Sequence, residues 1–320
     1  MAGIIKPKAL SPGDTVAVIA PSEPITLLEK DRIGRFFTQT GYKIKFGKNI
    51  LATVGDYCAG SARLRSDDLN SVFADPEVKA VFVAVGGMVA SQLLELIDFG
   101  LVKNSPKIFA GYSDSTTLQL AFLAKTGLVT FHSPNSLFLP GRKVKGYTLS
   151  NLWNVLTTTD KGVTIEPQSV WQEVRSGTAE GILFGGNLSC LCKLLGTNWD
   201  PIAALEKLFS GNQKFIFFWE EGYEQFSEIT RCLWQVRNTG FFARVSAMVV
   251  GKLTDVKERD YKDFPEKKDL LREVTNPFNF PILYGVDFGH EVPQATMPIG
   301  VPARVSTRNF HLEILEPAVV

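Results

Sequence analysis

The sequence predicts an α/β protein of two domains, the first of them built on a parallel sheet. The chain has 320 residues, which is too long for one ordinary small core and suggests two domains, although a single large α/β domain would also fit this length. Residues 16–20 are apolar along their whole length and residues 78–85 are apolar except for Lys79, as strands are when helices cover both faces of a parallel sheet. Segments with helical spacing of apolar residues lie between such strands, which is the pattern of βαβ units.

The first half of the chain contains the clearest alternation of strands and helices. A turn at Pro12-Gly13 introduces the first strand. Asp75-Pro76 ends a helix, because the residue before a proline avoids the helical conformation. The expected strands are 16–20, 42–46, 78–85, 108–110 and a short one from 128, and the expected helices are 25–40, 60–74, 91–97 and the segment that follows residue 113.

The second half has shorter strands and more turns, which predicts a separate domain. We expect the first domain to cover residues 1–140, a crossover with one helix to cover 141–178, and the second domain to cover 179–320. The elements expected in the second domain are a strand and helix over 177–196, strands at 214–219, 245–251 and 281–290, a helix at 229–236, and a charged surface excursion at 255–274.

Composition excludes several classes of function. The 34 Lys and Arg residues balance 33 Asp and Glu residues, giving a net charge of +1, so neither nucleic acid nor another polyanion is an expected partner. No apolar run reaches about 18 residues and no secretion signal opens the chain, so we expect a cytoplasmic protein without a membrane segment. Four cysteines fit no zinc spacing, and we interpret them as reduced core thiols: Cys58, Cys190, Cys192 and Cys232.

Ser113 lies at a turn between the strand 108–110 and a helix. A serine in a tight strand-to-helix turn projects from the edge of the sheet, and unpaired N–H groups at the start of the helix can bind an oxyanion. The sequence therefore makes Ser113 a candidate nucleophile. The alternative interpretation is that Ser113, Asp114 or Ser115 simply caps the helix, a common role for these residue types.

Other strand ends carry the partners that a nucleophilic serine needs. Gly86 and Gly87 follow the strand 78–85 and permit close approach of a ligand to the backbone, although the pair equally fits a plain turn from strand to helix. Glu220 follows the strand 214–219 and His290 follows the strand at 281, which supplies an acid and a base in the order Ser, Glu, His. Taken singly, Glu220 also fits a solvated turn and His290 a structural position.

Four blocks of the sequence resemble the LD-carboxypeptidase family of serine peptidases, which includes the microcin C immunity peptidases. They occur in order over nearly the whole chain, which makes the resemblance specific. The blocks are Leu10-Ser-Pro-Gly-Asp-Thr-Val-Ala-Val-Ile-Ala-Pro-Ser22, Gly111-Tyr-Ser-Asp-Ser-Thr116, Gly181-Ile-Leu-Phe-Gly-Gly-Asn-Leu188 and Gly289-His-Glu-Val-Pro-Gln-Ala-Thr-Met-Pro-Ile-Gly300.

The resemblance implies a flavodoxin-like first domain, a β-rich α/β second domain, a homodimer, and an active site between the domains without a metal or cofactor. It implies Ser113 as nucleophile, His290 as base and Glu220 as the acid, with Glu221 as the other candidate for the acid. The implied oxyanion donors are the backbone N–H groups of Gly87 and Asp114. Residues expected to contact substrate are Gly86, Met88 and His132, although His132 also fits a structural role.

The substrate stays open between two classes. Family members cleave the amide between an L-centre and a D-amino acid in cell-wall tetrapeptides, a step of peptidoglycan recycling, or the amide of aminoacyl-nucleotide toxins. Members of the first kind usually carry Arg-Gly-Gly-aromatic where this chain has Val85-Gly-Gly-Met88, and the immunity type has an Asn where this chain has Val89. A protein that binds a peptide or nucleotide without cleaving it is the alternative from another functional class.

Overall fold

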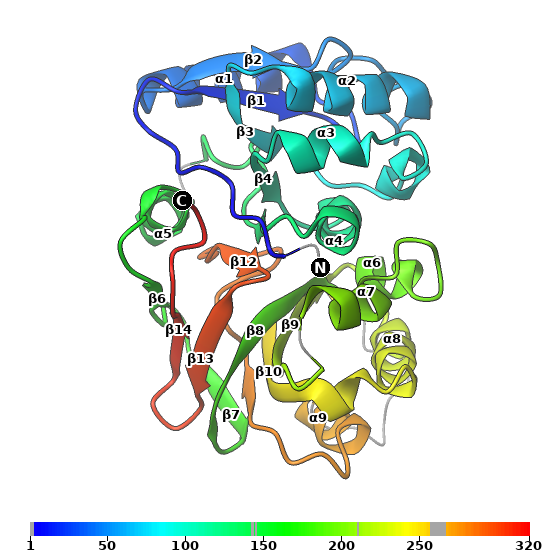
Figure 1. Cartoon of the computed structure of the whole chain (residues 1–320), viewed down its shortest axis with the longest axis vertical. Helices are drawn as coiled ribbons and strands as arrows, with labels where there is room; N and C mark the ends of the chain where they lie inside the picture. The colour runs from blue at the N-terminus through cyan, green and yellow to red at the C-terminus, as the bar shows by residue number, and fades with distance from the viewer. Residues whose placement is uncertain (1–2, 142–143, 145, 210, 257–266) are drawn as a thin grey trace.

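The structure is a computed structural model, and it confirms the predicted α/β class with two sheets (Figure 1). Residues 257–266, which belong to the predicted surface excursion, lie outside the described part of the chain. The described residues are 3–141, 144, 146–209, 211–256 and 267–320.

The first sheet has the strand order β12-β5-β4-β3-β1-β2. Its five N-terminal strands are parallel, and the order 2-1-3-4-5 is that of flavodoxin-like folds. Each residue of β1 is buried, as expected for a strand covered on both faces. The carboxyl ends of parallel strands share one edge of the sheet, so the segments that follow β1, β3 and β4 converge there. The strands are β1 (Thr15–Ile19), β2 (Lys43–Phe46), β3 (Val78–Val83), β4 (Ile108–Gly111) and β5 (Thr130–His132).

Two helices of the first half, α1 and α2, begin at ordinary capping residues. Thr26 forms a capping box with Glu29 at the start of α1, and Ser61 caps α2 through the N–H of Leu64. The segment expected as a helix at 91–97 is a short 3₁₀ turn, and an additional helix precedes β4. The elements are α1 (Leu27–Gln39), α2 (Ala62–Ala74), η1 (Ala90–Leu93), α3 (Phe99–Asn104) and α4 (Ser115–Thr126).

The second sheet has the order β6-β14-β13-β8-β9-β10-β11-β7. The four strands β8 to β11 are parallel, and antiparallel strands extend the sheet on both sides. The segment expected as a crossover supplies both outermost strands. The elements are α5 (Tyr147–Thr157), β6 (Val163–Ile165), β7 (Gln172–Arg175), β8 (Thr178–Asn187), α6 (Leu188–Leu194), α7 (Pro201–Leu208), β9 (Phe215–Gly222), α8 (Phe226–Asn238), η3 (Phe241–Arg244), β10 (Val245–Thr254), α9 (Lys267–Val274), β11 (Ile282–Tyr284), β13 (Pro302–Ser306) and β14 (His311–Ile314).

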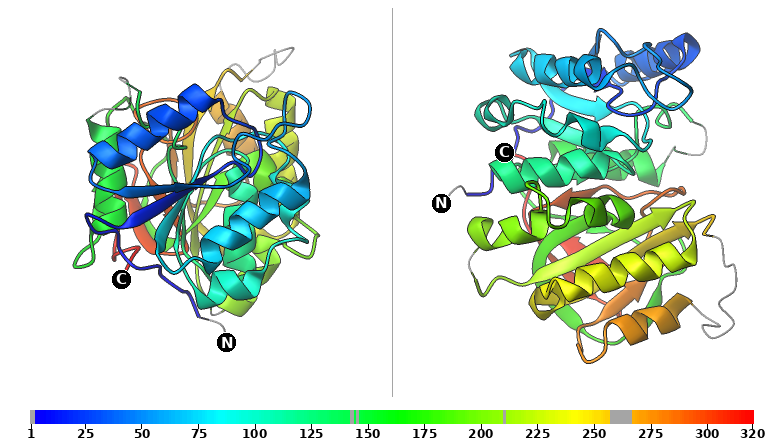
Figure 2. Two further views of the ribbon diagram at one scale, coloured as in Figure 1. Left: turned by 90° about the horizontal axis from the view of Figure 1, so that it is seen from above. Right: turned by 90° about the vertical axis from the view of Figure 1, so that its right-hand side faces the viewer.

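One short strand from the end of the chain joins the first sheet. β12 (Met297–Ile299) pairs antiparallel with β5, with Met297 opposite His132. The helix α4 packs against α6 and α7 of the second half, as the side view of Figure 2 also shows. The carboxyl edges of the two sheets therefore meet, and residues from both halves face one another across this junction.

None of the helices in the described ranges combines the length and the apolar character that crossing a bilayer requires. All four cysteines are buried, and none of them forms a disulfide.

Candidate active site

Ser113 occupies a strained turn directly after β4. Its φ is 63°, in the left-handed region that residues other than glycine adopt rarely. A Cβ on Gly111 would come within 2.8 Å of both Val83 and Ser115, so only glycine fits where the strand passes into the turn. Strain of this kind in a strand-to-helix turn is typical of a nucleophilic serine. Ser113 is therefore presented toward the junction of the two sheets.

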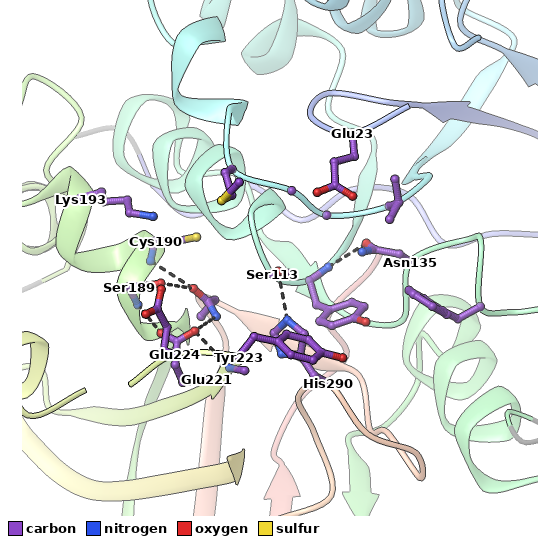
Figure 3. A pocket seen from close by; sticks show the side chains of 18 residues that line it. Glu23, Ser113, Asn135, Ser189, Cys190, Lys193, Glu221, Tyr223, Glu224 and His290 are labelled. Atoms are coloured by element: carbon purple, nitrogen blue, oxygen red, sulfur yellow. Dashed lines mark hydrogen bonds between the residues drawn. The ribbon is translucent and has the colours of Figure 1, made fainter. Parts of the chain in front are cut away.

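His290 lies between Ser113 and Glu220, and Figure 3 shows its imidazole next to Ser113. The Nε2 atom of His290 is 3.1 Å from Oγ of Ser113, and its Nδ1 atom is 2.6 Å from Oε2 of Glu220. If Nδ1 carries the proton and donates to the carboxylate, Nε2 is free to accept the serine proton. The structure thus brings the predicted serine, histidine and acid into one hydrogen-bonded chain, and it is Glu220, not Glu221, that contacts the imidazole.

Burial and charge shift the pKa values of Glu220 and His290 in opposite directions. Burial raises the pKa of the fully buried Glu220, but the charge and hydrogen bond of His290 outweigh it and leave that pKa below its ordinary value. Burial lowers the pKa of His290, while the charge and hydrogen bond of Glu220 raise it, and the net effect is an increase. The ring of Tyr112 packs edge-to-face with the imidazole, and the two ring centroids are 4.8 Å apart. The pair therefore holds a carboxylate against an imidazole whose pKa is raised.

The raised pKa of His290 predicts the position of the acid limb in the pH profile. Only neutral His290 can accept a proton, so activity falls as the pH drops through its pKa. Since that pKa is raised above 6.5, we expect the midpoint of the acid limb of kcat/KM above pH 6.5. Initial rates at subsaturating substrate over about pH 5 to 9 measure this limb. A midpoint at or below 6.5 would contradict the influence of Glu220 on His290.

The glycine pair lies directly beside the nucleophile. A Cβ on Gly86 would come within 3.0 Å of Cβ of Ser113, and a Cβ on Gly87 within 2.3 Å of Oγ of Ser22. Gly87 also has a φ of 137°, which disfavours other residues. Both positions therefore require glycine, and the backbone there approaches any group bound at Ser113.

The carboxylate of Asp114 anchors the glycine loop, a role that the sequence analysis missed. It accepts hydrogen bonds from Oγ of Ser22 at 2.7 Å and from the N–H of Ala90 at 2.8 Å. Oγ of Ser22 in turn accepts from the N–H of Val89 at 3.0 Å. An aspartate directly after the candidate nucleophile was visible in the sequence, but its partners lie on other strand ends.

Gly222 is a second residue that the sequence did not single out. A Cβ at this position would come within 2.8 Å of Cγ and Nδ1 of His290. We expect Gly222→Ala to push the imidazole out of line and to lower kcat/KM by about 10²-fold, as displacements of about 1 Å do in other active sites. Steady-state kinetics and thermal unfolding measure the two effects. Gly211→Ala is the control, because a Cβ there has open space; equal activity of both variants would contradict the prediction.

Ser113 opens into a cavity of about 380 Å³ between the two halves. The predicted contacts Gly86 and Met88 line it, together with Val85. Met88 is 69% exposed, so its side chain is available to a ligand. The charged side chains that line the cavity among the described residues are Glu23, Lys193, Glu221, Glu224 and His290.

His132 does not lie in this cavity, which corrects its prediction as a substrate contact. Its side chain is fully buried and packs edge-on against the rings of Tyr112, Phe218 and Phe288. Burial lowers the pKa of His132 to about 4, so the ring is neutral near pH 7. Its place at the end of β5, where β12 covers it, makes it a core residue.

Glu221 does not contact the imidazole of His290, and its side chain lines the cavity. It accepts hydrogen bonds from Nδ2 of Asn187 at 2.7 Å and from the N–H of Ser189 at 2.9 Å. The same Asn187 amide lies 3.2 Å from Glu220 and so bridges the two carboxylates. Burial, followed by the charge of Glu220, raises the pKa of Glu221 to about 7.

Comparisons with known proteins agree with this architecture. Residues 16–133 match the model of the LD-carboxypeptidase N-terminal domain, and residues 180–305 match that of the LD-carboxypeptidase C-terminal domain. The chain is 35% identical to a probable murein peptide carboxypeptidase of Bacillus subtilis, covering 94% of this chain and 92% of the relative. It is 28% identical to the microcin C7 self-immunity protein MccF of Escherichia coli, covering 96% and 94% of the two chains.

Solved structures show the same fold. The structure of MccF in complex with glutamyl sulfamoyl guanosine matches with a TM-score of 0.85 at 25% identity, covering 98% of this chain and 99% of the other. An MccF-like protein from Bacillus anthracis matches with the same TM-score and coverage at 26% identity. The chain therefore belongs to the LD-carboxypeptidase family, and it is a serine-type peptidase.

Proposed function

We propose that this peptidase is an LD-carboxypeptidase that hydrolyses the terminal amide of cell-wall tetrapeptides with Ser113, His290 and Glu220. The observation that carries the proposal is the continuous chain of contacts from Oγ of Ser113 through His290 to the buried Glu220, at the wall of a cavity. A protein that only bound a ligand would have no need of this arrangement.

In this mechanism Oγ of Ser113 attacks the carbonyl carbon while Nε2 of His290 takes the hydroxyl proton. Glu220 stabilises the imidazolium that forms, and the backbone N–H groups of Gly87 and Asp114 bind the oxyanion. His290 then protonates the leaving amine, and water hydrolyses the acyl-enzyme with His290 again as base. No step requires a metal or an organic cofactor.

The relatives and the charges of the cavity support the tetrapeptide substrate. Curated relatives include a protein named murein tetrapeptide carboxypeptidase, from Pseudomonas aeruginosa. Among the described lining residues, the carboxylates of Glu23, Glu221 and Glu224 outnumber Lys193 and His290, which disfavours a phosphate-bearing ligand. Cytoplasmic action in peptidoglycan recycling and assembly as a homodimer belong to the same proposal, and the family resemblance supports them.

Cleavage of aminoacyl-nucleotide amides is the second candidate function. It is favoured by the fold match to MccF structures, whose ligands include glutamyl sulfamoyl guanosine and aspartyl sulfamoyl adenosine. The two candidates differ in the leaving group, which is a D-amino acid in one case and a nucleotide moiety in the other.

Mass spectrometry after incubation separates the candidates. The purified chain is offered a tetrapeptide ending in D-alanine and, in parallel, an aminoacyl nucleotide of the microcin type. We expect the tripeptide and free D-alanine from the first. Product from the nucleotide alone would establish the second candidate, and binding without product from either would favour the non-catalytic alternative.

A further inference from the structure

Arg65 is a buried arginine of α2 whose guanidinium group contacts the segment that follows the glycine pair. The residue is only 2% exposed. Its Nη1 atom donates to the carbonyls of Pro21 at 2.6 Å and of Val89 at 3.1 Å, and its Nε atom donates to the carbonyl of Gly60 at 3.3 Å. Its Nη2 atom donates to Oε1 of Gln92. The guanidinium group thus connects α2 with the end of β1 and with the start of η1.

Arg65 and Asp114 bind opposite sides of one peptide group. The carbonyl of Val89 accepts from Arg65, and the N–H of Ala90, which belongs to the same peptide group, donates to Asp114 at 2.8 Å. Oγ of Ser22 donates to the same carboxylate at 2.7 Å and accepts from the N–H of Val89 at 3.0 Å. A cation at the oxygen and an anion at the hydrogen polarise the peptide group, which strengthens both hydrogen bonds. The peptide group 89–90 is therefore fixed in position and orientation.

The two charges of this bridge are both buried. Burial lowers the pKa of Arg65, and the charges of Cys58 and Asp114 oppose this shift. Asp114 is itself only 3% exposed, so solvent screens its interaction with Arg65 little. A buried charge is costly unless hydrogen bonds and an opposite charge compensate it. The bridge through the peptide group supplies both kinds of compensation.

The glycine pair depends on anchors outside itself. Glycine has more backbone freedom than any other residue, so the direction of the Gly87 N–H is not fixed by its own backbone preferences. On one side of Gly87, the N–H of Glu23 donates to the carbonyl of Gly86 at 3.1 Å. On the other side, the peptide group 89–90 follows within two residues. The N–H of Gly87 is thus held between two anchored points, and the second of them depends on Arg65.

We propose that Arg65 is a positioning residue for the oxyanion hole, because together with Asp114 it fixes the peptide group 89–90 and thereby the N–H of Gly87. This inference rests on the proposed function, whose mechanism assigns that N–H to the oxyanion. Arg65 lies outside the described lining of the Ser113 cavity, so it acts through the backbone and not by contact with substrate. Its loss should weaken binding of the transition state and leave binding of the substrate unchanged.

Arg65→Met removes the charge and keeps much of the side-chain volume. We expect kcat for a tetrapeptide ending in D-alanine to fall by about 10²-fold, near the value of one oxyanion donor, at an unchanged KM. The midpoint of the acid limb should not move, because burial and the charges of Glu220 and Glu221 set the pKa of His290. A raised KM at unchanged kcat, or a shifted midpoint, would overturn the inference.

Arg65→Lys tests the inference if Arg65→Met does not fold, which thermal unfolding measures. Lysine keeps the charge but lacks the planar set of donors, so kcat should lie between those of the wild type and of Arg65→Met, again at an unchanged KM. Arg63→Met is the matched control on the same helix. Arg63 is exposed and pairs with Asp67 at 3.1 Å, and exposed ion pairs contribute little, so this variant should match the wild type. A wild-type kcat in Arg65→Lys and Arg65→Met would overturn the inference.

The double variant Arg65→Met/Asp114→Asn tests whether the two residues share one peptide group. If they do, the double variant should lose about as much kcat as the more impaired single variant, because the second substitution acts on a bridge that is already broken. Losses that multiply would show independent roles and would overturn the bridge.

Phosphonylation of Ser113 separates this inference from the proposed function. A phosphonofluoridate places its phosphoryl oxygen in the oxyanion hole, so its rate of capture reports on the hole without a peptide. If the wild type is labelled on Ser113 but cleaves no tetrapeptide, the proposed function fails. Labelling of Arg65→Met that is slower by about 10-fold or more would still support the inference, and equal rates would overturn it. A wild type that is not labelled on Ser113 would overturn both proposals.

Discussion

Replacing Ser113 by alanine is expected to abolish hydrolysis while the chain stays folded. Loss of a serine nucleophile removes the covalent step, and kcat/KM should fall by about 10³-fold or more. The strained φ of 63° at this position is no harder for alanine than for serine, and the removed hydroxyl contacts His290 at the wall of a cavity. Release of D-alanine measures the activity, and circular dichroism with thermal unfolding measures the fold.

Ser150→Ala is the matched control for this substitution. Ser150 lies on α5, and its hydroxyl donates to the carbonyl of Tyr147 within the same helix. We expect this variant to keep full activity. Turnover of Ser113→Ala close to that of Ser150→Ala would exclude Ser113 as the nucleophile.

Replacing Glu220 by glutamine is expected to lower kcat by about 10⁴-fold, as the equivalent change does in other serine peptidases. Glutamine has the shape of glutamate but lacks the charge that stabilises the imidazolium, and its amide group can hold the wrong tautomer of His290. Because Glu220 is fully buried and lies 2.6 Å from Nδ1 of His290, solvent cannot replace it. Single-turnover kinetics with the tetrapeptide measure the loss.

Glu221→Gln is the control, since it removes the neighbouring carboxylate without touching the imidazole. We expect the kcat of Glu221→Gln to exceed that of Glu220→Gln by at least about 10²-fold. The reverse order of the two losses would assign the acid of the triad to Glu221.

Much of the fold could be predicted because several buried strands are long enough to be recognised in the sequence as runs of apolar residues. The apolar sequences of β1 and β3 predict a parallel sheet that is covered on both faces. The turn predicted after β4 makes Ser113 a candidate nucleophile. β12 could not be predicted, since its three residues include a proline and have no periodicity of their own. Only the antiparallel pairing with β5 makes this segment a strand.

The sequence predicts which residue types form the candidate site, but it does not predict which groups these residues contact. Glu220 and Glu221 are adjacent and chemically identical in the sequence, and only the position of His290 distinguishes them. The roles of the Asp114 side chain and of Gly222 depend on groups far away in the chain. The chain has only three histidines, which makes His132 a candidate contact in the sequence, but the structure buries it among aromatic rings.

Covalent capture of the nucleophile tests the central claim most directly. A phosphonofluoridate reacts with an activated serine, and digestion followed by tandem mass spectrometry locates the adduct. We predict a single adduct on Ser113 in the wild type, with labelling slowed strongly in His290→Ala. An adduct on another residue, or an unlabelled Ser113 in a preparation that still releases D-alanine, would contradict the assignment of Ser113 as the nucleophile.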